Sequence, residues 1–229
     1  SYLPQILPHG FESFELTTWA RLPEGLDLAD HGKKVQDLLS DQAIISSVGI
    51  YGNPLQEEAT AADWETLIRS AKFFGCNVVC GFAGALEDRP VDESMPKFNE
   101  VPSEALGLEW EPCHQMVSLV SPLPQLKKWV NRVYHVHGKD ASIEWDVLRS
   151  EGLRSGKQFI WHRTPGFGDT NWTDIITILR MNGWRGAIDI EGWHDPVYRD
   201  DLEMTGQVHG LNYLKACRGG AYVPSPAER

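Results

Sequence analysis

Apolar positions along the chain follow two patterns, short runs typical of strands and longer stretches with helical spacing. The strand-like runs occupy 11–17, 43–51, 77–82, 105–111, the start of 132–140, and 186–191. Helical spacing is found in 1–10, 26–39, 61–74, 123–130, 172–181 and 201–217, and a further helix is expected to begin near Ile143. Apolar strands that alternate with helices of about 10–15 residues predict βαβ units around a parallel sheet.

Either a doubly wound sheet or a (β/α) barrel would satisfy this pattern, and polar residues discriminate between them. They lie where strands are expected to end, at Glu15, Asn53, Glu111, His137 and Glu191. In a barrel, active-site groups sit at the carboxyl ends of many strands. No glycine-rich phosphate loop follows a strand, so a nucleotide-binding doubly wound fold has no support. The pattern therefore favours an α/β barrel.

The stretch 132–140 contains two histidines on one strand. His135 and His137 are two residues apart, so their side chains point to the same face. Lys139 and Asp140 follow at once, either as pocket groups or as an ion pair with each other. A metal or catalytic role and a role as core histidines are both open for this pair.

Two further strand ends supply carboxylates. Strand parity places Glu109 with Glu111, and Asp189 with Glu191. Together with His137, the terminal members Glu111 and Glu191 form a candidate metal-ligand set. Oxygen and imidazole donors suit Mn²⁺, Mg²⁺, Co²⁺ or Zn²⁺ better than softer ions. The alternative is that these acids form salt bridges with arginines, namely Arg132, Arg163 or Arg185.

Several polar and aromatic residues near these motifs are candidate substrate-binding groups. His114 lies three residues after Glu111 and would bind metal or a substrate oxygen, and Arg163 lies near a Pro-Gly turn. Aromatic faces stack on sugar rings, although tryptophans more often pack in a core. The candidate substrate-binding residues are His114, His162, Arg163, Lys139, Glu15 and Trp19.

Composition narrows the function classes. The net charge of −11 opposes a nucleic-acid surface, because phosphate binding requires Lys and Arg. The four cysteines show neither paired zinc spacing nor a dense disulfide framework. With no segment that resembles a signal peptide or a membrane span, we expect a cytoplasmic protein without membrane partners.

The ordered motifs of the chain resemble those of a known superfamily. They are GFESFEL (10–16), SSVGIYGNPL (46–55), FGCNVVCGFAG (74–84), LGLEWEPCHQM (106–116), YHVHGKDA (134–141), HRTPGFGD (162–169) and AIDIEGWHDP (187–196). The chain resembles the sugar phosphate isomerase/epimerase superfamily of xylose isomerase-like TIM barrels. The resemblance implies a single (β/α)8 barrel domain over 1–229. Strands 1 and 5 of that barrel are not visible here, which indicates missing segments before residue 1 and around 85–104.

The resemblance also implies one divalent metal ion, with Mn²⁺ favoured and Mg²⁺, Co²⁺ or Zn²⁺ as alternatives. The family's Asp, His and final Glu ligands fall on Glu111, His137 and Glu191, with Glu in place of Asp at 111. The family's first Glu ligand has no counterpart. His114 falls on a substrate-contacting histidine, and we expect Glu191 and His114 to be catalytic.

The implied activity is that of a metal-dependent isomerase or epimerase acting on a small sugar. A metal-stabilised enediolate would follow proton removal next to a carbonyl. One alternative is a metal-dependent lyase that cleaves 3-keto-glycosides, and another is an inactive barrel that binds a sugar or a partner. An AP endonuclease is opposed by the acidic charge. Association into a homo-oligomer is allowed by analogy with the family.

Overall fold

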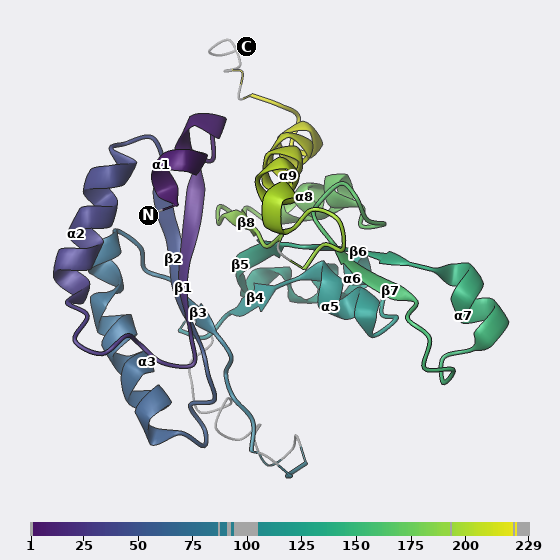
Figure 1. Cartoon of the computed structure of the whole chain (residues 1–229), viewed down its shortest axis with the longest axis horizontal. Coiled ribbons are helices and arrows are strands. Elements are labelled where there is room, and N and C mark those ends of the chain that lie inside the picture. The colour runs from purple at the N-terminus through teal and green to yellow at the C-terminus, as the bar shows by residue number, and fades with distance from the viewer. Residues whose placement is uncertain are drawn as a thin grey trace. The chain divides into compact units, whose positions relative to one another are not determined.

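The computed structural model describes residues 2–86, 88–90, 93, 105–192, 194–221 and 223. The chain forms two compact units (Figure 1). The first comprises 1–110 and 132–136, and the second comprises 111–131 and 137–229. The boundary crosses one strand, β5 (Val133–Gly138), between Val136 and His137. The expectation of a single domain over 1–229 stays a prediction.

The first unit is built on a parallel sheet in the order β1-β2-β3. Its strands are β1 (Ser13–Trp19), β2 (Ile44–Tyr51) and β3 (Val79–Gly81). In Figure 1, helices α2 (Leu28–Leu39) and α3 (Glu58–Ser70) lie along the same side of this sheet. The core between them is apolar and contains Val35, Leu39, Val48, Ile50, Leu67 and Phe74.

Local signals explain where these elements begin and end. The chain opens with α1 (Leu3–Ile6) and the 3₁₀ turn η1 (Leu7–His9), which stops at Gly10 with φ of 83°. Asp27 caps α2 by accepting hydrogen bonds from two backbone N–H groups of its first turn. Helix α3 continues as η2 (Ala71–Phe74) and ends at Gly75, also in the left-handed region. The predicted boundaries are therefore confirmed within a few residues.

One further parallel pair completes the first unit. Strand β4 (Leu108–Trp110) lies beside the start of β5, and a register shift after Leu108 brings Glu109 opposite His135. Strand β4 is shorter than the predicted 105–111, and Glu111 already directly precedes helix α5 (Pro112–Val117).

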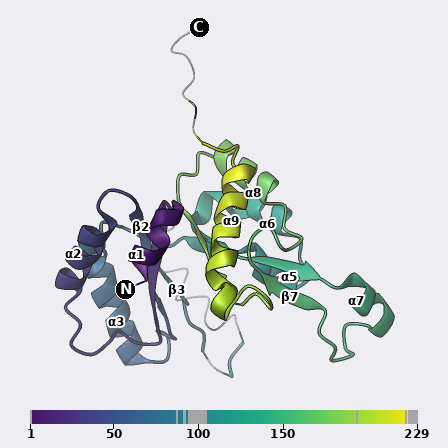
Figure 2. The ribbon, with the colours of Figure 1, turned by 45° about the horizontal axis from the view of Figure 1, so that its top comes forward.

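The second unit contains the strand β8 (Ile188–Ile190) and most of the later helices. The helices are α5 (Pro112–Val117), α6 (Pro122–Trp129), α7 (Trp145–Glu151), α8 (Trp172–Met181) and α9 (Glu203–Cys217), with 3₁₀ turns η3 (Val130–Arg132) and η4 (Asp200–Leu202). Helices α8 and α9 lie side by side (Figure 2). The side chains of Leu126, Trp172 and Ile175 are completely buried. The predicted helix 172–181 is confirmed at both ends.

The sequence pattern missed an antiparallel pair in the second unit. Strand β6 (Asp140–Ile143) pairs with β7 (Ile160–Arg163), with Asp140 opposite Arg163. The helix expected near Ile143 begins instead at Trp145, after β6 has ended. His162 and Arg163, for which the sequence pattern predicted no strand, lie in β7. Only four residues long and half polar, β6 carries too weak an apolar signal to be recognised.

The described strands do not form one continuous sheet, and no closed barrel is found among them. Their alternation of helices with mainly parallel strands matches the predicted α/β architecture. The segment in which the fifth barrel strand and the first metal Glu were sought, around 85–104, lies largely outside the described residues. Within the described ranges, every helix is too short or too polar to cross a lipid bilayer.

Candidate metal centre

Three of the predicted metal ligands converge in the second unit, in what we call the Glu111 triad (Glu111, His137 and Glu191). The Nδ1 atom of His137 lies 3.6 Å from Oε2 of Glu111 and 3.4 Å from Oε2 of Glu191. Donors that each lie ~2.1 Å from an octahedral cation are ~3.0 Å apart when adjacent and ~4.2 Å apart when opposite. The triad therefore has the spacing of three ligands around one ion.

Lys139 contacts the other side of both carboxylates. Its Nζ lies 2.8 Å from Oε1 of Glu191 and 3.8 Å from Oε1 of Glu111, while His137 faces the two Oε2 atoms. The lysine is almost fully buried. Oε1 of Glu111 is also buried, and within the described part of the chain it has no hydrogen-bond partner. Lys139 therefore holds Oε1 of Glu191 by a hydrogen bond and lies near Oε1 of Glu111, while the Oε2 atoms of both glutamates face the imidazole, which fits a metal site.

The carboxylates of the triad are held in the ionised form. Burial opposes ionisation of Glu111, but hydrogen bonds from His114 and His137 and the charge of Lys139 outweigh it and lower its pKa to about 2. For Glu191, burial is likewise outweighed by His137 and Lys139, and its pKa also falls to about 2. Charged oxygens are the form that binds a divalent cation.

Two further histidines, His114 and His194, lie next to the carboxylates of the Glu111 triad. Nε2 of His114 lies 3.3 Å from Glu111, and Nε2 of His194 lies 3.0 Å from Glu191. The hydrogen bond to Glu111 raises the pKa of His114, whereas burial and the charge of Lys139 lower the pKa of His194. The His114 side chain is 67% exposed, so it can meet a ligand that arrives from solvent.

His162 lies between these two rings, and its own ring contacts the thiol of Cys113. Its ring centroid is 6.4 Å from that of His114 and 5.6 Å from that of His194. Its Nδ1 atom lies 3.0 Å from Sγ of Cys113, which is completely buried. Burial and the neighbouring carboxylates raise the pKa of Cys113 to about 12, so the thiol stays protonated. Cys113 thus orients His162 rather than acting as a nucleophile.

Local chain geometry explains how Glu111 is placed. Glu111 ends the β4 segment in an extended conformation, and Pro112 starts helix α5 immediately after it. This helix was not predicted, although the Glu-Pro step is a recognisable start signal. His114 therefore lies on the first turn of α5 rather than on a loop.

Two completely buried aspartates, Asp140 and Asp195, fix the loops around the triad. Asp140 accepts hydrogen bonds from the backbone N–H groups of Ala141, Gly166 and Thr170 and from the indole of Trp172. This is neither the pocket group nor the ion pair with Lys139 that the sequence suggested.

Asp195 accepts from Nε of Arg163 at 3.1 Å and from the backbone N–H of Thr164 at 2.9 Å. Its other oxygen accepts from the N–H groups of Val197 and Tyr198. The Nε atom of Arg163 thus donates a hydrogen bond to the loop that follows Glu191. Its role in substrate binding stays a prediction.

The remaining candidates, Glu15 and Trp19, belong to the first unit. Glu15 is the third residue of β1 and not at its end, and it accepts hydrogen bonds from Ser47 and Tyr51. Trp19 is 74% exposed and stacks on Tyr51 with ring centroids 5.8 Å apart.

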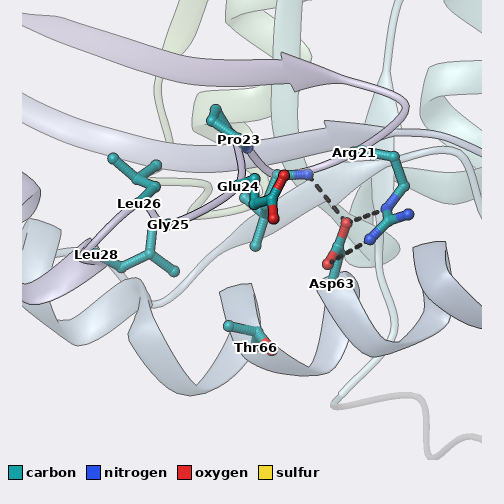
Figure 3. Close-up of a pocket in the computed structure, with 9 residues that line it drawn as sticks. Arg21, Pro23, Glu24, Gly25, Leu26, Leu28, Asp63 and Thr66 are labelled. Atoms are coloured by element: carbon teal, nitrogen blue, oxygen red, sulfur yellow. Dashed lines mark hydrogen bonds and ion pairs between the residues drawn. The ribbon is translucent and has the colours of Figure 1, made fainter.

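A surface cavity of ≈ 550 Å³ lies elsewhere in the first unit (Figure 3). It is lined by the segment 21–26, Leu28, Asp63 and Thr66. Figure 3 shows Arg21 directed at Asp63, which also accepts a hydrogen bond from the backbone N–H of Leu22. None of the predicted metal or substrate ligands lines this cavity.

Comparison with known proteins places the chain. The family model described as xylose isomerase-like TIM barrel matches residues 91–217, which is more than half of the chain. This chain belongs to the xylose isomerase-like TIM barrel family. The matched range contains every member of the Glu111 triad as well as Lys139 and His114.

Curated relatives of this xylose isomerase-like chain include enzymes. An inosose dehydratase of Clostridium perfringens is 33% identical over 131 residues, which cover 54% of this chain and 42% of the relative. The rhizopine catabolism protein MocC of Rhizobium meliloti is 30% identical over 129 residues, covering 54% of this chain and 36% of the relative. The alignments thus span less than half of the length of these relatives.

Solved structures share the fold at low sequence identity. The probable 3-DHS dehydratase AsbF of Bacillus anthracis has a TM-score of 0.60 at 18% identity, with 92% of both chains covered. The 3-keto-D-glucoside 4-epimerase YcjR of E. coli has a TM-score of 0.58 at 15% identity, covering 94% of this chain and 93% of YcjR. These likenesses establish the xylose isomerase-like fold.

Sequence reasoning missed some neighbours of the predicted residues. The contact of Cys113 with His162 and the contact of Tyr51 with Glu109 join residues far apart in sequence. No spacing rule connects such pairs without the fold. A serine within an apolar strand, as at Ser47, was the signal for a buried polar partner.

Proposed function

We propose that this chain is a metal-dependent enzyme that removes a proton next to the carbonyl group of a keto-sugar or keto-polyol. The observation that carries the proposal is the convergence of His137 Nδ1 on the Oε2 atoms of Glu111 and Glu191, with Lys139 on the opposite oxygens. Glu111, His137 and Glu191 would hold the cation, and we favour Mn²⁺ over Mg²⁺, Co²⁺ or Zn²⁺.

When bound, the cation would polarise the carbonyl and stabilise negative charge on its oxygen. Glu191 is the most exposed of the three triad side chains, and it would accept the proton from carbon. Lys139 would hold Glu191 in place through the 2.8 Å contact with Oε1. His114, exposed beside Glu111, would bind a substrate hydroxyl and move its proton.

The fate of the carbanion equivalent separates two candidate functions. Return of the proton to the other face or the neighbouring carbon gives an epimerase or isomerase, which is the outcome predicted from the sequence. Loss of a β-hydroxyl as water, with a proton supplied to that oxygen by His114, gives a dehydratase. The similarity to an inosose dehydratase at 33% identity favours the second outcome. Cleavage of a 3-keto-glycoside would use the same first step.

Exchange of carbon-bound hydrogen tests the shared step directly. The protein is incubated with inosose, a free ketose or a 3-keto-glycoside in D₂O with Mn²⁺, and the substrate is followed by NMR. We expect deuterium at the carbon next to the carbonyl with one of these substrates, and its loss on chelation or in Glu191→Gln. The exposed Asp201→Asn is the matched control in the same unit. Exchange that persists in Glu191→Gln would overturn the proposal.

The same assay separates the outcomes. Dehydration produces a new carbonyl compound that absorbs in the near ultraviolet, whereas epimerisation or isomerisation leaves the composition unchanged. Absence of exchange with every substrate, despite bound metal, would support a binding protein instead. Cytoplasmic location and homo-oligomer formation stay predictions.

A further inference from the structure

A second group of possible metal-ligand atoms lies in the first unit. Carboxylate oxygens of Glu15 and Glu109 and a ring nitrogen of His135 all lie within 4.8 Å of one another. Nε2 of His135 is 2.8 Å from Oε2 of Glu15. These three residues, which we call the Glu15 cluster, come from strand β1 and from the parallel pair β4 and β5.

The Glu15 cluster lies inside the protein. The side chain of His135 is 2% exposed and that of Glu15 is 6% exposed. Gly49 on β2 makes room for it, because a Cβ there would lie 3.0 Å from Oε1 of Glu15. A buried imidazole and buried carboxylates that share one location are costly unless charge is compensated nearby.

Tyr51 shows that the two carboxylates share a partner. Its hydroxyl lies 2.9 Å from Oε1 of Glu15 and 3.1 Å from each oxygen of Glu109. A tyrosine hydroxyl has one proton to donate. One proton serves one carboxylate, so the hydroxyl oxygen faces the other carboxylate with its lone pairs. A cation between the glutamates would remove this conflict.

We propose that Glu15, Glu109 and His135 form a second divalent-cation site with a structural role. The 2.8 Å separation of His135 and Glu15 donors is close to the ~3.0 Å expected for adjacent ligands of an octahedral ion. Tyr51 and Ser47, which donate hydrogen bonds to Glu15, would orient its carboxylate without contacting the ion themselves. The burial of His135 and Glu15 suits an ion that stabilises the fold and is not reached by substrate.

Counting bound Mn²⁺ on the intact chain tests the proposal. We expect two ions per chain, one in Glu191→Gln, one in Glu15→Gln and none in the double variant. Loss of a ligand should weaken the affected site by about 100-fold or more, since even outer partners cost about 10–100-fold. The exposed Glu12→Gln, three residues before Glu15, is the matched control. Unchanged stoichiometry and affinity in Glu15→Gln would overturn the proposal.

A second variant and a second measurement cover the case in which Glu15→Gln does not fold. Glu109→Gln changes the other carboxylate of the cluster and should lose the same ion. In Glu191→Gln, bound Mn²⁺ should broaden the ring resonances of His135 and Tyr51 by paramagnetic relaxation, and sharp resonances at saturating Mn²⁺ would overturn the proposal. The proposed function can fail separately: one ion per chain, lost in Glu15→Gln but retained in Glu191→Gln, would refute the Glu111 triad alone.

Discussion

Two clusters of similar composition are organised around histidines that are two residues apart on β5. The Glu15 cluster joins His135 to two glutamates, and the Glu111 triad joins His137 to two others. The first cluster is made of residues within strands, with a tyrosine hydroxyl between its carboxylates. In the triad, Glu111 and Glu191 follow the ends of β4 and β8, and a lysine faces both.

Two clusters with the same types of ligand thus differ in position, so ligand type alone does not assign a function to either cluster. His135 and Glu15 are held within strands and are almost completely shielded from solvent, which suits a structural ion. Residues just beyond strand ends can meet a substrate, but their loops need separate support, here from Asp140 and Asp195. This is the division between stabilising and reactive positions that parallel α/β folds share.

The largest expected effect separates the clusters by activity. Glu191→Gln should lower the rate of proton exchange from substrate carbon by about 10²–10⁴-fold, the usual contribution of a general base. Glu15→Gln should leave that rate within a few-fold once the protein is folded. Single-turnover exchange in D₂O at saturating Mn²⁺ measures both, and an equal loss in the two variants would remove the functional distinction.

The next largest expected effect is a loss of stability when the buried Lys139 is replaced. Lys139→Met leaves two facing carboxylates without their cation and should lower the free energy of unfolding of the metal-free protein by about 3–5 kcal/mol. Mn²⁺ should recover more stability in this variant than in the wild type, because the ion replaces the lost charge. Denaturant unfolding with and without chelator measures this, and the exposed Lys127→Met on α6 is the control.

A buried carboxylate in a supporting loop should give a pH-dependent effect. Backbone hydrogen bonds from Tyr198, Thr164 and Val197 outweigh burial and lower the pKa of Asp195. A lowered folded-state pKa contributes stability that is present above the unfolded pKa of about 3.9 and is lost as pH falls through the folded value.

Asp195→Asn should therefore cost about 2 kcal/mol at neutral pH and less below about pH 3.9. Unfolding curves of the metal-free wild type and variant across pH 2–7 measure this difference. A difference that grows on acidification would contradict the assignment.

The smallest expected effect is that of removing the Tyr51 hydroxyl beside the Glu15 cluster. Tyr51→Phe removes the hydroxyl between Glu15 and Glu109 and should cost about 1 kcal/mol of stability without metal. If the cation site exists, the variant should also bind its Mn²⁺ about tenfold more weakly. Calorimetric titration in the Glu191→Gln background isolates this site. Equal affinity with and without the hydroxyl would show that Tyr51 does not orient the ligands.

Much of the architecture was predictable from sequence because apolar periodicity is a local signal. The helix 172–181 and the strands around Val48 and Val136 follow from spacing alone. The antiparallel pair β6–β7 was missed because neither strand shows a clear alternation of apolar and polar residues. The two strands are also separated in sequence by helix α7 and its loops.

The candidate site was predictable in its chemistry but not in its contacts. Strand parity brought out Glu111, His137 and Glu191, and the structure brings the three together. Parity also grouped Glu109 with Glu111, yet the two contribute to different clusters, because the chain leaves β4 at Glu111 to begin α5. Which residue faces which cluster depends on the register shift after Leu108, and sequence carries no signal for that shift.

Pulsed electron paramagnetic resonance of Mn²⁺ bound to Glu15→Gln tests the central claim most directly, because this variant keeps only the Glu111 triad. We expect coupling to one imidazole nitrogen, and we expect this coupling to disappear when His137→Asn is added to the same background. Coupling that survives without His137 would contradict a metal centre built on Glu111, His137 and Glu191.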